Sequence, residues 1–155
     1  MTAKKSEKIR RLTGRPGVGG LDPRYAAYFE CFNRGDYYDA HDVLEDLWLE
    51  QGRGAADHAF YKGLIQGAGA FVHLQKHYAE PTHPVHGRRL EPAVRLLLLC
   101  LKNLSAYPAR HLGLDVGVAG RLFGDIREQL QNSHCRENPW RPDELPQLPK
   151  PEAGK

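Results

Sequence analysis

The placement of glycine and proline most constrains this fold, because these residues divide the chain into segments with a helical repeat of apolar residues. Asp22-Pro23 has the order of an N-cap followed by proline at the first helical position, and Gly35 stands where that helix should end. No segment shows the alternation of β-branched residues between turn residues that marks a strand. The pattern predicts an all-α protein, an antiparallel helical bundle with short loops.

About five helices are expected. The predicted ranges are 23–34, 37–51, 57–79, 86–106 and 115–131. In the third range Gly63 and Gly67 lie four residues apart, so another helix can approach the backbone there. The longest apolar run, Leu96 to Leu101, has six residues. A membrane-spanning helix needs about 20, so no span is expected.

The two ends of the chain differ in composition from the middle. Residues 1–20 carry six basic residues and one acidic residue and end in a glycine-rich run, which predicts a flexible basic arm. Residues 133–155 contain five prolines, which predicts an extended tail. Trp140, Leu145 and Leu148 suggest that part of this tail lies on the body. The bundle domain is therefore expected over residues 21–132.

Composition and cysteine usage indicate a soluble, cytoplasmic protein. No apolar stretch follows the basic N-terminus, so no secretory signal is expected. Cys31, Cys100 and Cys135 are odd in number and form no Cys-x-x-Cys pair, which is not a disulfide framework. The first two lie in apolar helical contexts and are predicted to be core residues.

The predicted helix 37–51 has two distinct polar features when drawn at 100° per residue. Four acids form its outer, solvent-facing side: Asp39, Asp42, Asp46 and Glu50. His41 falls at the edge of the apolar stripe near Trp48, and Glu45 is the one acid away from the outer side. Because His41 and Glu45 are four residues apart, they are neighbours on the helix.

The predicted helix 57–79 carries a narrow polar line. Its members are Lys62, Gln66, His73 and His77. Such a line faces either solvent or a polar cleft. The small residues Gly69 and Ala70 flank it, which favours close packing against another element.

The run from Phe32 to Trp48 resembles a bacterial and archaeal helical family known as domain of unknown function 309. The family's signature is His-x-x-x-Glu-x-x-Trp, carried here by His41, Glu45 and Trp48. Its second block, Gly-Leu-Ile-Gln, matches residues 63–66, with His73 soon after. The resemblance extends over roughly 25–130. It implies an all-α bundle and does not imply a reaction.

The leading hypothesis for these residues is a buried structural clasp in an interaction module. In it His41 pairs with Glu45 or Gln66 while Trp48 packs the helical hairpin, because buried polar groups need partners. A module of this kind would bind a protein partner or form a homo-oligomer. A clasp explains the motif without a reaction, so whether the protein is an enzyme stays open.

The alternative is a metal or small-ligand site between the second and third predicted helices, with hydrolysis as one activity that it would allow. Its candidate residues are His41, Glu45, Trp48, Gln66 and His73. His41, Glu45 and His73 would be the metal ligands, and imidazole with carboxylate suits Zn, Fe or Mn. Histidines 77, 83 and 86 lie around a loop and are expected to stay uncoordinated.

A third hypothesis is nucleic-acid association through residues 1–20, since a basic arm can bind by counterion release. The middle of the chain carries no basic stripe, which argues against it. Arg88 and Arg89 open the fourth predicted helix. Anion binding is one role for this pair, but helix starts favour acids, so the preferred assignment is to solvent.

Overall fold

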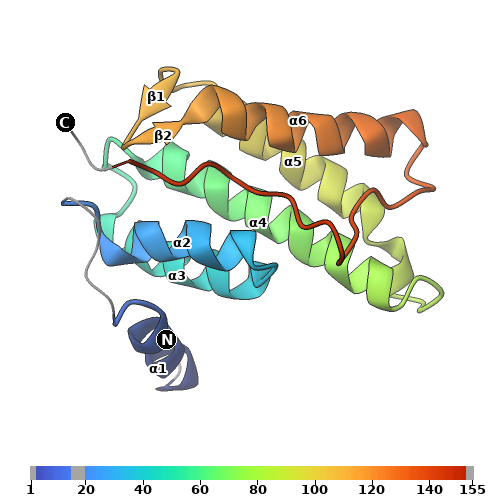
Figure 1. Ribbon diagram of the computed structural model, residues 1–155, viewed down its shortest axis with the longest axis horizontal. Helices are drawn as coiled ribbons and strands as arrows, with labels where there is room; N and C mark the ends of the chain where they lie inside the picture. Colours follow the sequence, from blue (N-terminus) through green and yellow to red (C-terminus); the bar gives the residue numbers. More distant parts are fainter. Residues whose placement is uncertain (1–2, 15–19, 153–155) are drawn as a thin grey trace.

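The computed structural model describes residues 3–14 and 20–152, which form a helical bundle with one small hairpin (Figure 1). The helices are α1 (Ala3–Leu12), α2 (Pro23–Asn33), α3 (Tyr37–Gln51), α4 (His58–Ala79), α5 (Leu90–Leu104) and α6 (Val116–Asn132), with a 3₁₀ turn η1 (His86–Arg88). The strands β1 (Arg110–His111) and β2 (Leu114–Asp115) pair antiparallel. The predicted all-α bundle is confirmed.

Local signals fixed the helix ends as expected. The Asp22 carboxylate accepts a hydrogen bond from the Arg24 amide, and Pro23 opens α2. Gly35 and Gly52 follow α2 and α3 with φ of 84° and 78°, the left-handed region that favours glycine. The fourth predicted helix, 86–106, is shorter than expected because η1 precedes α5.

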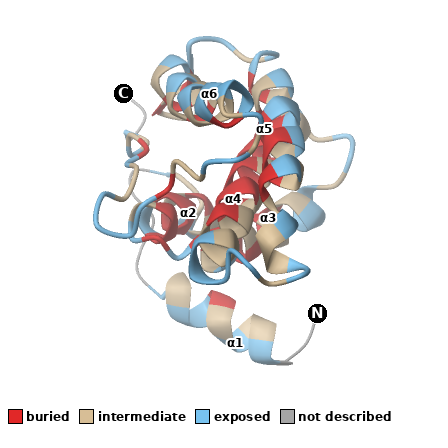
Figure 2. Ribbon diagram, turned by 90° about the vertical axis from the view of Figure 1, so that its right-hand side faces the viewer, coloured by how far each residue is buried: buried red, intermediate tan, exposed pale blue. Residues whose placement is uncertain are grey.

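Helix α4 runs through the middle of the bundle, with α2 and α3 on one side and α5 and α6 on the other (Figure 1). Buried residues follow it along its length (Figure 2). A Cβ at Gly67 would lie 2.7 Å from the Phe123 ring, and one at Gly63 would lie 3.2 Å from the Cys100 carbonyl. The two glycines therefore allow the close approach of α5 and α6 that the sequence suggested.

The β1–β2 hairpin was not predicted. Each strand has two residues, so no alternating pattern exists to be read from the sequence. The hairpin is held from outside: His111 Nε2 lies 2.6 Å from Asp57 Oδ1, beside the start of α4.

The prediction of a disordered basic arm over 1–20 is wrong for residues 3–12, which form α1 and pack on α3 and α2. A helix of this length is marginal alone, so docking must stabilise it. Lys5 and Lys8 meet acids of α3, and Ile9 is 7% exposed. The helical wheel placed Asp42 on the solvent-facing side, although it is only 8% exposed. Residues 1–2 and 15–19 of the predicted arm lie outside the described residues.

The outer side of α3 is also paired further along the helix. Arg24 lies 2.9 Å from Asp46 and pairs with Glu50 as well. The acids that the helical wheel placed in solvent are thus bound by cations from two other helices.

Beyond α6 the chain turns at residues 133–135 and then continues to residue 152 without a helix or strand, with a second turn at 142–143. Residues 153–155 of the predicted tail lie outside the described residues. We call residues 136–152 the C-terminal strap. It returns along α4 towards the hairpin (Figure 1). Trp140 and Leu148 are buried and Leu145 packs against the core, so these three residues do lie on the body.

Candidate functional site

The motif histidine His41 is oriented by the next residue rather than by Glu45. Its Nδ1 lies 3.1 Å from Asp42 Oδ1. Burial alone would raise the pKa of Asp42, but hydrogen bonds from His41 and Lys8 and the charges of Lys8 and Lys5 lower it to about 2. The ionised carboxylate can only accept, so the contact assigns the proton to Nδ1. In the neutral ring Nε2 then carries the lone pair.

Glu45 is turned towards α1. Its Oε1 accepts a hydrogen bond of 2.8 Å from Lys5 Nζ, while its Oε2 lies 3.7 Å from His41 Nε2. The second distance is too long for a hydrogen bond. The pairing of His41 with Glu45 is therefore a proximity along the helix, and the stronger partner of Glu45 is a lysine.

His73, on α4, is held in the opposite tautomer. Arg89 Nη1 lies 3.0 Å from His73 Nδ1, and because the guanidinium can only donate, Nδ1 accepts. Burial, and then the positive charges of Arg89, Lys76 and Arg95, hold the pKa of His73 below its ordinary value. The neutral ring therefore presents Nε2–H as a donor.

His41 and His73 line the same cleft, which has a volume of about 240 Å³. It lies between α3 and α4, as the sequence suggested, and α5 and the residue before it complete it. The other lining residues are Tyr38, Gly69, Val72, Lys76, Arg89 and Leu96. No carboxylate is among them, and Lys76 Nζ lies 5.3 Å from the centre of the Tyr38 ring.

The remaining motif residues lie elsewhere. Trp48 packs its indole against the His58 ring, with 5.0 Å between centroids. Its Nε1 is buried and has no hydrogen-bond partner among the described residues. Gln66 accepts a hydrogen bond of 2.7 Å from Asn103 on α5. The structure thus brings together His41 and His73, keeps Glu45 at the edge, and separates Trp48 and Gln66 from them.

Three residues of the cleft escaped the sequence reasoning. Lys76 follows His73 by three residues and so shares its helix face, a signal that could have identified it. Tyr38 is exposed, and no sequence pattern marks it as a cleft residue. Arg89 was assigned to solvent, but it is half-buried and bonded to two histidines, because η1 turns the chain back over α4.

Glu80, His83 and His86 form a separate group whose ligand atoms lie within 4.8 Å of one another. His83 Nδ1 accepts hydrogen bonds from the amides of Val85 and His86. His86 Nδ1 accepts from Arg89 Nε at 2.8 Å. Both rings therefore carry their proton on Nε2, and a metal ion could bind there only after these bonds rearranged.

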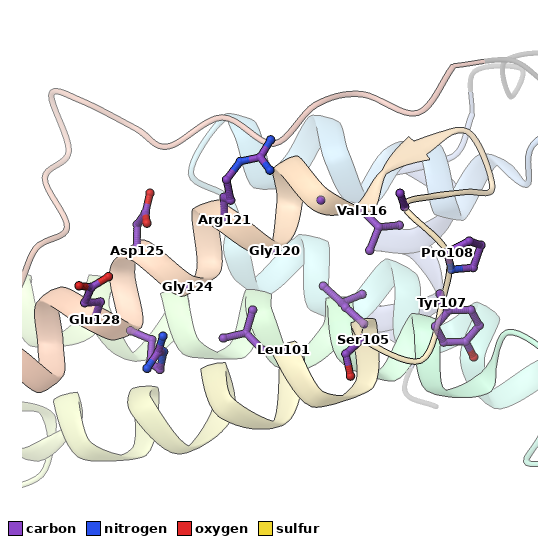
Figure 3. Close-up of a pocket in the computed structure, with 14 residues that line it drawn as sticks. Leu101, Ser105, Tyr107, Pro108, Val116, Gly120, Arg121, Gly124, Asp125 and Glu128 are labelled. Carbon is purple, nitrogen blue, oxygen red and sulfur yellow. The ribbon is translucent and has the colours of Figure 1, made fainter.

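A groove of about 540 Å³ lies between α5 and α6 (Figure 3). Leu101, Ser105 and the loop residue Tyr107 lie along one side, and Gly120 and Gly124 lie along the other. Charges of both signs surround the groove, and none of the site residues predicted from the sequence lines it.

The cysteines have no role in these sites. Cys31 and Cys100 are buried, as predicted, and Cys135 is partly buried. Burial raises the pKa of the Cys31 thiol to about 11, so the thiol stays protonated and inert.

One family model matches part of the chain. Residues 25–82 match the model of the family described as Domain of unknown function (DUF309). The match covers α2, α3 and α4 and includes His41, Glu45, Trp48, Gln66 and His73. Comparisons with curated proteins and with solved structures gave no match. Among the described residues no helix is both long and apolar enough to cross a membrane.

Proposed function

We propose that this chain, whose residues 25–82 belong to the DUF309 family, binds a small oxyanion, a carboxylate or phosphate group, in the cleft between α3 and α4. One observation carries the proposal: the donors His73, Lys76 and Arg89 converge on a cleft that no carboxylate lines. Small-molecule sites combine an apolar wall with a few convergent polar groups, and this cleft has both.

Arg89 is positioned in advance for such a ligand. Its Nη1 donates to His73 and its Nε donates to His86, so the guanidinium is fixed from two sides. A guanidinium has five N–H donors, and these two bonds leave the others for a ligand. Arginine binds carboxylate and phosphate in a forked geometry, and a fixed guanidinium loses less entropy on binding.

The other lining residues complement this charge. Lys76 supplies a second cation, and His73 Nε2–H supplies a neutral donor. Val72 and Leu96 form an apolar wall that suits the uncharged part of a ligand. The volume of about 240 Å³ limits the occupant to a small molecule or to one group of a larger one.

The same lining disfavours a divalent metal ion. Lys76 and Arg89 would repel it, and His73 Nδ1 already accepts from Arg89. Glu45, expected as a ligand, pairs with Lys5. The site of His41, Glu45 and His73 for Zn, Fe or Mn remains a prediction with less support than the anion site.

The clasp hypothesis also has less support. The His41 side chain is 31% exposed, and Gln66 pairs with Asn103 rather than with the motif. Nucleic-acid binding through the N-terminal segment has fewer cations available than the sequence suggested, because Lys5 and Lys8 pair with acids of α3. The exposed cations of α1 are Lys4, Arg10 and Arg11.

The test is titration with inorganic phosphate and with acetate, followed by the amide and side-chain NMR signals of the cleft. We expect saturable shifts at Tyr38, His41 and His73. Arg89→Ala should weaken binding at least about ten-fold, which corresponds to about 1.4 kcal/mol and suits the loss of a charge-assisted contact.

The matched control is Arg88→Ala, which removes the same charge from the neighbouring exposed position. Its affinity should stay within about two-fold of wild type. Equal losses in both variants would show a general charge effect, and the absence of saturable shifts in the wild type would exclude the proposed function.

A further inference from the structure

The carboxylates closest to His41 are covered by α1. Lys5 Nζ lies 2.8 Å from Glu45 Oε1, and Lys8 Nζ lies 2.6 Å from Asp42 Oδ2. Lys8 also lies 3.2 Å from Asp39 Oδ1. Asp42 and Glu45 are the two acids that approach the His41 ring, at 3.1 and 3.7 Å. The two lysines therefore neutralise the only negative charges recorded beside this ring in the described residues.

We infer that α1 determines the charge of ligand that the His41 cleft accepts, with Lys5 and Lys8 as the specificity-determining residues. While α1 is docked, the cleft presents cations and neutral groups to a ligand. When α1 leaves, Asp42 and Glu45 become uncompensated beside His41 and oppose an anion. The inference rests on the proposed anion site and adds its regulation.

The positions of the charges support this role. Neither lysine lines the cleft, so neither is expected to contact the ligand. They act through the carboxylates of Asp42 and Glu45, which lie close to His41, a residue that lines the cleft. Asp42 Oδ1 lies 3.1 Å from His41 Nδ1, well inside the screening length of about 8 Å at physiological ionic strength, so salt screens the effect of its charge on the cleft only in part.

The attachment of α1 suits a detachable cover. Among the described residues of α1, Ile9 is the one buried side chain, with Leu12 partly buried. Ion pairs also join Lys5 and Lys8 to three acids of α3. Anion binding should therefore favour the docked state of α1, and docking should favour anion binding by the same factor.

The first experiment compares two double variants of the full chain. Lys5→Ala/Lys8→Ala removes the two cations that face α3, and Lys4→Ala/Arg10→Ala removes two exposed cations of the same helix. Both lower the net charge equally. With inorganic phosphate as the probe, we expect at least about ten-fold weaker binding for the first variant and a change within about two-fold for the second.

A rescue separates charge compensation from loss of the helix. Lys5→Ala leaves Glu45 without its lysine, and adding Glu45→Gln removes the orphaned charge. Phosphate affinity should fall in Lys5→Ala and return to within about two-fold of wild type in Lys5→Ala/Glu45→Gln. Without that recovery, the carboxylate is not the intermediary and the inference is overturned.

A measurement without any bound ligand keeps the two proposals distinct. Anionic and cationic nitroxides of equal size are added, and their relaxation effects on the Tyr38 and His41 ring protons are compared. In the wild type and in Lys4→Ala/Arg10→Ala the anionic nitroxide should act more strongly. In Lys5→Ala/Lys8→Ala this preference should be lost or reversed.

These measurements distinguish failure of the proposed function from failure of the inference about α1. If phosphate and acetate fail to bind the wild type, the proposed function fails, and the nitroxide preference still decides whether α1 sets the charge of the cleft. An unchanged preference in Lys5→Ala/Lys8→Ala overturns the inference, whatever the phosphate titration shows.

Discussion

The two terminal segments of the chain lie outside the family match and attach to the same bundle by different means. Helix α1 attaches through lysines 5 and 8, with Ile9 as its buried side chain. The C-terminal strap attaches through Trp140 and Leu148, which are 5% and 2% exposed. Ion pairs therefore hold α1 on the bundle, whereas buried apolar surface holds the strap.

Hydrogen bonds to buried partners strengthen the strap. Trp140 Nε1 donates to the Tyr37 hydroxyl at 2.8 Å. The Asn33 amide brackets the backbone of Leu148, donating to its carbonyl at 3.0 Å and accepting from its N–H at 2.7 Å. These contacts cross about a hundred residues of sequence and make the strap part of the core.

Partly exposed ion pairs contribute little free energy and weaken in salt, whereas burial of a large aromatic side chain is strong and insensitive to salt. The comparison therefore indicates that α1 can leave the bundle while the strap cannot leave without unfolding it. This difference is what suits α1, and not the strap, to a regulatory role.

The largest expected effect is on the strap side. Trp140→Ala should lower the free energy of unfolding by about 3–5 kcal/mol, because it removes a buried aromatic side chain and leaves the Tyr37 hydroxyl without its donor. Urea unfolding of the variant measures this. Glu144→Ala, at an exposed strap position, is the control and should change little; a loss below about 1 kcal/mol in Trp140→Ala would contradict a core role for the strap.

A smaller loss is expected at Asn33. Asn33→Ala removes both hydrogen bonds to Leu148 and leaves its N–H unpaired at a buried position, which should cost about 1–3 kcal/mol in the same assay. Gln147→Ala, which removes an exposed donor to the Asn33 carbonyl, should cost less. Equal losses of unfolding free energy in the two variants would show that the hydrogen bonds at the buried Leu148 contribute no more than an exposed one.

Acid should release α1 before it disturbs the strap. The pKa of Asp42 is lowered in the folded protein from 3.8 to about 2, so folding stabilises its ionised form. That contribution is fully present above about pH 4 and is lost as the pH falls towards 2. Hydrogen exchange of α1 amides should accelerate across this window ahead of the Trp140 indole N–H. Simultaneous loss of both would argue that α1 and the strap form one cooperative unit.

The smallest effect belongs to a single ion pair. Lys8→Ala should lower global stability by about 1 kcal/mol or less, since detachment of α1 returns Asp42 to water and leaves no buried charge unpaired. The difference from wild type should vanish in about 1 M salt, where charges are screened over roughly 3 Å. A difference that persisted in salt would mean that α1 is held mainly by apolar contacts.

Much of the fold could be predicted because its signals are local. Asp22-Pro23, Gly35 and Pro81 mark helix ends within one or two residues, and capping and breaking depend only on near neighbours. Two of the four basic side chains of the cleft could also be identified, since His41 and His73 lie on polar edges of predicted helices. Arg89 was not accessible, because its burial depends on how η1 folds back over α4.

The amino-acid sequence by itself determined five of the helices, the close approach at Gly63 and Gly67, and the match of residues 25–82 to a family model. Tertiary structure alone decided what the polar side chains meet. The helical wheel placed Asp42 in solvent, and α1, more than 30 residues earlier, buried it. Helical periodicity reports only on residues within a few positions of one another, while an ion pair between distant segments exists only after the chain has folded.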